Sequence, residues 1–244
     1  MRFHEYIGAQ RKNLEAALKF ELFATTCPQM DSLYELSIAG CPQDKSPVFG
    51  QFLLICHKSF LSAATLIGQA QPDDAAPITR RAIEVIRLAA AVKADPSVAT
   101  EWVAYEKRME RWKARDEGKK PERFHVQIPV EHELVEQLMV TWGIISDADV
   151  HFTPEYFHSL RWEKRGDSMF LQYFSGEQRT IESAIIQLVG AHRLMLQVLD
   201  ECLDSAFSAN AEWRKLRDEI YAAGKPYADK MERTADSDEP ASES

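Results

Sequence analysis

The chain has few of the residues that interrupt regular structure. Its 244 residues include only ten glycines and eleven prolines. An all-β sandwich needs tight turns at short intervals, and such turns depend on both residue types. The shortage therefore disfavours a sandwich and favours a protein built from long helices.

Cysteine and metal-binding patterns are also scarce. The four cysteines include no CxxC pair, and no histidine stands at the spacing of a zinc site. Glu155-x-x-His158 has the spacing that di-iron helical bundles use twice, but a proline stands beside it. We expect reduced thiols, no metal and no cofactor, because a chain of this length can bury a core without a disulfide or a metal.

Long apolar runs are missing too. Nowhere do eighteen apolar residues follow one another, and residues 1–20 lack the apolar core of a signal peptide. We therefore expect a cytoplasmic protein with no membrane partner.

Positive charge is in deficit. Lys and Arg number 29 against 38 Asp and Glu, which gives a net charge of -9. Long duplex nucleic acid and anionic membranes are bound through a surplus of Lys and Arg, so neither is an expected partner. Residues 233–244 form an acidic tail that we expect to be disordered.

Apolar residues recur at helical spacing along most of the chain. The predicted helices cover residues 3–25, 47–70, 76–94, 96–117, 130–146, 176–207 and 210–232. The first is expected to stop at Cys27 and Pro28, and the stripe Trp102, Tyr105, Met109 and Trp112 in the fourth is expected to be core. Alternating residues around 160–174 predict one hairpin. The expected fold is all-α, a multi-helix bundle with one inserted β-hairpin, forming a single domain over residues 1–232.

A histidine lies in the stretch "SDADVHFTPEYF". Pro154 pushes Thr153 toward an extended backbone, so the preceding helix should end just before His151. A helix C-terminus favours a protonated imidazole, and Asp147 or Asp149 could orient the ring as a general acid or base requires. The alternative is a histidine that packs and satisfies a backbone carbonyl.

Three charged residues share one face of a predicted helix. Arg80, Glu84 and Arg87 follow one another in steps of four and three. They could form a solvated ladder of ion pairs of little energetic weight. Alternatively, Glu84 holds a guanidinium that faces an anion inside the bundle.

The segment "RRAIEVIRLAA", followed downstream by "SDADVHFTP", a hairpin and long C-terminal helices, resembles a group of uncharacterised bacterial all-α proteins. That group looks like a remote branch of the HEPN superfamily (higher eukaryotes and prokaryotes nucleotide-binding), and the likeness covers roughly residues 47–210. It implies that Arg80, Glu84 and His151 share one site for a small anionic ligand or an RNA end. A regulatory role in stress or defence is implied by the resemblance alone, which also leaves a homodimer open.

Catalytic HEPN ribonucleases carry an Arg, four to six residues, then a His. Ile144, Ile145 and Ser146 occupy the Arg positions before His151. The main hypothesis is therefore a ligand-binding or regulatory module. The alternatives are a metal-independent ribonuclease that uses His151 as general acid or base with Arg80 stabilising the charge, and a purely structural interaction module. Whether the protein is an enzyme is left open.

Overall fold

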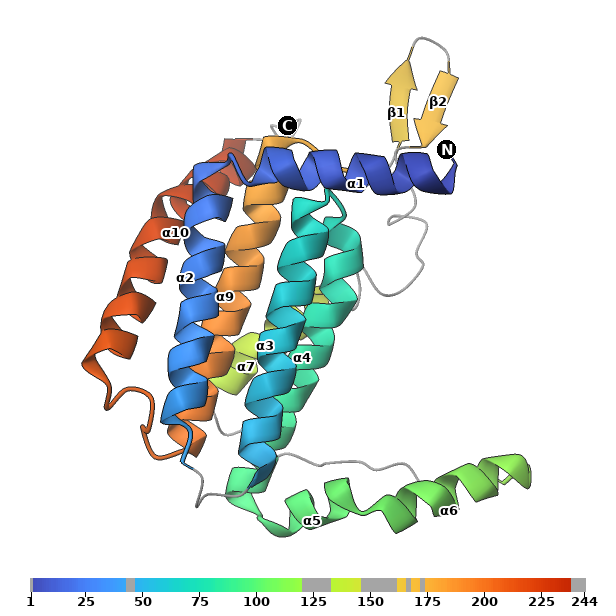
Figure 1. Cartoon of the computed structure of the whole chain (residues 1–244), viewed down its shortest axis with the longest axis vertical. Coiled ribbons are helices and arrows are strands. Elements are labelled where there is room, and N and C mark those ends of the chain that lie inside the picture. The colour runs from blue at the N-terminus through green and yellow to red at the C-terminus, as the bar shows by residue number, and fades with distance from the viewer. Residues whose placement is uncertain are drawn as a thin grey trace, which may run out of the picture.

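The computed structural model describes residues 2–42, 47–119, 133–145, 162–165, 168–171 and 174–237. Helices make up more than half of the chain, which confirms the all-α class (Figure 1). They are α1 (Phe3–Ala17), α2 (Glu21–Gly40), α3 (Pro47–Gly68), α4 (Pro72–Ala94), α5 (Ser97–Val103), α6 (Tyr105–Asp116), α7 (Glu133–Ile145), α9 (Gln178–Cys202) and α10 (Ala211–Ser237).

The apolar helix α3 forms the centre of the bundle. It contacts α1, α2, α4 and α9, while α10 covers α2 and α9 from outside (Figure 1). Among the described residues, α3 is the one helix long and apolar enough to cross a membrane, but 44% of its most apolar window is buried inside the bundle. A buried core helix meets the same criterion, so one such helix is weak evidence for a membrane span.

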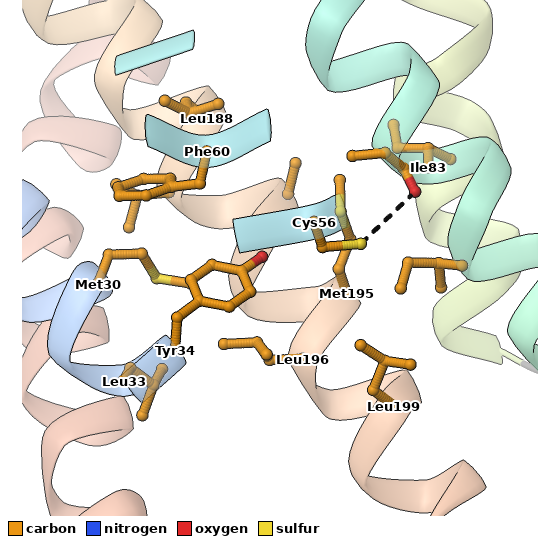
Figure 2. Packing of buried hydrophobic residues seen from close by; sticks show 14 of the residues in the cluster. Met30, Leu33, Tyr34, Cys56, Phe60, Ile83, Leu188, Met195, Leu196 and Leu199 are labelled. Carbon is orange, nitrogen blue, oxygen red and sulfur yellow. Dashed lines mark hydrogen bonds between the residues drawn. The ribbon is translucent and has the colours of Figure 1, made fainter. Parts of the chain in front are cut away.

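Side chains from four helices meet in the core. Figure 2 shows Tyr34 of α2, Cys56 of α3, Ile83 of α4 and Met195 of α9 directed toward one another. The Cys56 thiol lies 4.0 Å from the carbonyl oxygen of Ala82, and burial raises the pKa of Cys56 to about 12. All four cysteines are free in the structure.

The prediction for the N-terminal helix was wrong. The chain forms two helices, because α1 ends at Ala17 and α2 begins at Glu21 and continues through Pro28. Proline inside a helix removes one hydrogen bond and costs about 3 kcal/mol. Burial of the α2 face that includes Met30 and Tyr34 offsets this cost, because each large apolar side chain contributes about 1.5–3 kcal/mol.

The predicted fourth helix is divided at Ala104 into α5 and α6. Trp102 packs against Phe52 with ring centroids 5.2 Å apart, in agreement with a core role. Met109 and Trp112 are 38% and 68% exposed, so their assignment to the core was wrong. The reason is that α6 extends away from the described helices of the bundle (Figure 1).

The C-terminal part also differs from expectation in detail. Helix α10 continues past residue 232 to Ser237, and residues 238–244 lie outside the described residues.

Two short segments, β1 (Trp162–Arg165) and β2 (Ser168–Leu171), pair antiparallel with Trp162 opposite Leu171.

The turn between α3 and α4 places the start of α9. Ala70 has a positive φ of 64°, and the backbone N–H of Gln71 donates to the backbone carbonyl of Leu66. These features close α3 as a Schellman motif. The Ser175 amide donates to the Ala70 carbonyl at 2.8 Å. The segment leading into α9 is thus tied to the segment leading into α4.

Two glycines of α3 provide a matched test of this packing. A Cβ on Gly68 would lie 2.7 Å from Leu14 and 2.9 Å from Phe23, whereas a Cβ on Gly50 would meet nothing within 4 Å. We expect Gly68→Ala to destabilise the protein by about 1–3 kcal/mol through overpacking. Gly50→Ala should instead be neutral or stabilise by up to about 1 kcal/mol. Urea unfolding measures both stabilities. A Gly68→Ala variant as stable as Gly50→Ala would contradict the close approach of α1 and α2 to Gly68.

Candidate functional site

A cavity of about 630 Å³ lies between α4, α7 and α9. Pro72 and Asp73 of the first turn of α4 line it, as do Arg179 and Thr180 of the first turn of α9. The N-termini of two long helices therefore meet at this cavity. Helix N-termini present unpaired amides and the positive end of the helix dipole, which favours anions.

The rest of the lining combines hydroxyl groups with an apolar floor. Thr79 of α4, Thr141 of α7 and Ser183 of α9 contribute hydroxyls, and Gln187 contributes an amide. Ile67, Ala75, Leu188 and Ala191 form apolar wall. Between Arg179 and Ala191 the cavity follows α9 for about 18 Å, at 1.5 Å per residue. Such a lining can bind an elongated polar molecule.

The structure brings Arg80 and Glu84 together, beside this cavity. Arg80 Nε lies 3.6 Å from Glu84 Oε1, and the Arg80 guanidinium stacks 4.6 Å from the ring centroid of Trp142 on α7. Trp142 Nε1 donates to Glu84 Oε1 at 3.3 Å. Ala76, one helical turn before Arg80, lines the cavity, but Arg80 does not. The Arg80–Glu84–Trp142 cluster therefore fastens α7 to α4 and holds one wall in place.

The other predicted site residues are not brought into this cluster. Arg87 is partly buried, and its Nε has no hydrogen-bond partner in the described part of the chain. Asp147 and His151 lie outside the described residues, as do Glu155 and His158. Within the described ranges, no group of three His, Cys, Asp or Glu side chains is arranged to hold a metal.

A second polar group lies in the core. His192 of α9 is fully buried, and its Nδ1 lies 2.6 Å from the Tyr34 hydroxyl. Burial raises the pKa of Tyr34 well above its usual value, so the phenol keeps its proton and we assign it as the donor. Burial, and secondarily the charge of His57, lowers the pKa of His192 to about 3. His192 is therefore neutral in the folded protein.

This core group is connected to the surface through His57 of α3. The His57 ring stacks on Tyr34 with centroids 4.9 Å apart, and its Nε2 lies 2.6 Å from Asp31 Oδ1. Asp31 is 42% exposed and His57 is 17% exposed. A row of polar side chains thus leads from solvent to His192, whose Nε2 has no hydrogen-bond partner among the described residues.

Comparisons with known proteins add no constraint to this geometry. No family model, no curated protein and no solved structure matches the chain. The resemblance to the HEPN superfamily consequently remains a prediction.

Several residues of these sites were missed by the sequence analysis. Trp142 and Arg179 have no distinctive motif around them, and Tyr34 and His192 are separated by most of the chain. The one available signal was the polar residue His57 within the apolar helix α3, because a titratable side chain there needs a partner.

The Arg80–Glu84–Trp142 cluster predicts a ranking of stabilities. Arg80→Ala should lower the free energy of unfolding by about 1–2 kcal/mol, since it removes both the cation–π contact and the aliphatic packing. Glu84→Gln should cost less than about 0.5 kcal/mol, because the Glu84 side chain is 50% exposed. Urea unfolding of both variants tests the ranking, and equal losses would show that Trp142 does not hold Arg80.

Neutral His192 predicts a loss of stability in acid. Below about pH 6.5 the unfolded chain protonates this imidazole, while the folded protein does so only near pH 3. The contribution of the neutral ring to the free energy of unfolding is complete above about pH 6.5. It decreases by about 1.4 kcal/mol for each unit by which the pH falls below that value. Urea unfolding between about pH 7 and pH 4 should show a steeper decline for the wild type than for the double variant Tyr34→Phe/His192→Leu. Parallel declines would contradict a neutral buried ring.

Proposed function

We propose that the protein is a ligand-binding module that holds a phosphate monoester, on a nucleotide or at an RNA end, in the α4–α7–α9 cavity. The observation that carries the proposal is the N-terminus of α9 at a cavity that Arg179 also lines. The volume of about 630 Å³ falls in the usual range of small-molecule sites, about 300–1,000 Å³.

The cavity offers a distinct partner for each part of such a ligand. The Arg179 guanidinium and the amides of the first turn of α9 suit the phosphate, through charge-assisted hydrogen bonds. The Asp73 carboxylate, which is buried at the start of α4, can accept hydrogen bonds from sugar hydroxyls. The apolar residues Ile67 and Leu188 suit the face of a base.

Arg80 has an indirect role in this proposal. It positions α7 against α4 through Trp142 and so keeps Thr141 in the cavity wall. This differs from the sequence-based hypothesis that Arg80 itself meets the anion.

The remaining hypotheses are supported by the sequence analysis alone. The metal-independent ribonuclease depends on His151 and is an alternative proposal. We also propose that β1 and β2 form an inserted hairpin between α7 and α9, and that the single-domain protein is cytoplasmic.

A thermal-shift titration tests the proposed function. Adenosine monophosphate at a hundred times Kd should raise Tm by about 5–10 °C, whereas uncharged adenosine should have a much smaller effect. Arg179→Gln should remove the preference for the phosphate. Ser183→Leu should weaken binding, because the larger side chain occupies part of the cavity. Oligoribonucleotides with and without a 5′-phosphate distinguish an RNA end from a free nucleotide.

The matched control is Gly50→Leu on α3, away from the cavity, which should retain the full ligand response. Duplex DNA should not bind at physiological salt, given the net charge of -9. If no phosphate compound shifts the wild type, or if Ser183→Leu responds as the wild type does, the cavity is not the site.

A further inference from the structure

A second, smaller crevice of about 260 Å³ lies between α2, α9 and α10. Leu22 of α2, Ile185 and Val189 of α9, and Ile220 of α10 give it an apolar wall. It shares only Ile186 and Gly190 with the first cavity. The volume lies below the usual range for drug-sized ligands, so the crevice suits a short molecule.

Two glycines line this crevice at positions where the packing of neighbouring side chains does not require glycine. Gly190 lies in the middle of α9 and Gly224 in the middle of α10, and both line the crevice. A Cβ added to either would meet nothing within 4 Å. Alanine is more favourable than glycine inside a helix. Glycine at these positions is therefore not required by the neighbouring side chains, and its effect is to leave the crevice open.

The crevice has an excess of positive charge in an acidic protein. Arg193 and Lys225 line it together with Asp229, which leaves one net positive charge in a chain of net charge -9. Asp229 has an interaction of its own in the structure. The charge of the crevice is thus opposite in sign to that of the protein as a whole.

Arg193 is the more buried of the two cations that line the crevice. Its guanidinium lies 5.0 Å from the ring centroid of Tyr221, and its Nη1 donates to Gln197 Oε1 over a long 3.5 Å. No carboxylate lies within ion-pairing distance of it in the part of the chain that the structure describes; nearby Asp218 is paired with Arg217 at 2.8 Å. Burial lowers the pKa of Arg193, as expected for a cation removed from water.

We propose that the α2–α9–α10 crevice binds an amphiphilic carboxylate, with its aliphatic tail between Ile185, Val189 and Ile220 and its carboxylate on Arg193. A planar guanidinium matches a carboxylate through two parallel hydrogen bonds. The ligand would place a carboxylate within ion-pairing distance of Arg193, which no carboxylate of the described residues does, and its tail would cover apolar wall. This site is separate from the phosphate site and does not depend on it.

Calorimetric titration with octanoate tests the proposal, with octanamide and acetate as matched probes. Octanamide keeps the tail and loses the charge, and acetate keeps the charge and loses the tail. Each should bind the wild type at least about tenfold more weakly than octanoate does, since a hydrogen bond to a charged group or several buried methylenes contribute that much. Equal affinity for octanoate and octanamide would overturn the assignment of an anion.

Two variants locate the ligand. Arg193→Gln should reduce the affinity for octanoate to the level of octanamide, and this loss of charge preference is a result that a structural role of Arg193 would not produce. Gly224→Leu should abolish octanoate binding by filling the crevice, and its open surroundings predict that it folds. Gly50→Leu on α3 should bind octanoate as the wild type does. Failure of the wild type to bind octanoate, or unchanged binding by Gly224→Leu, would show that the crevice is not such a site.

Discussion

The burial of α3 is the constraint on which the rest of the structure depends. Its apolar side chains occupy most of the helix circumference, so a single neighbouring helix cannot remove them from water. Helices α1, α2, α4 and α9 each cover one part of α3 (Figure 1). Leu54, Lys58 and Leu61 form an exposed stripe of α3. Once these four helices are placed, α7 and α10 pack on their outer sides, and both cavities lie between the inner and the outer helices.

The same arrangement explains why the larger cavity is polar at one end. α3 ends at Gly68, where Leu14 and Phe23 leave no room for a side chain, and the chain reverses at Ala70 into α4. The hydrogen bond from Ser175 to Ala70 brings the start of α9 to the same level. Two helix N-termini therefore lie at one end of the bundle because of a packing requirement, and the positive ends of their dipoles lie there as a consequence.

Helical periodicity predicts much of this fold and little of the candidate sites. α3, α4 and α9 are evident from the sequence because their apolar faces are long and regular. The boundaries around Pro28 and Ala104 were wrong because burial decides whether a helix continues, and burial is a tertiary property. The pair Arg80 and Glu84 follows from the four-residue spacing alone. Trp142 and Arg193 could not be identified, since their significance depends on helices far away in the sequence.

The buried pair Tyr34 and His192 also limits which bundles this sequence can form. Apolar side chains pack in many rotational settings of a helix, whereas a hydrogen bond 2.6 Å long is made in very few. Turning α2 by one residue, about 100°, would carry the Tyr34 hydroxyl away from α9 and leave both polar groups unsatisfied in the core. Alternative packings of equal hydrophobic burial are thereby disfavoured. The polar pair thus selects one helix arrangement among those that hydrophobic burial alone would permit.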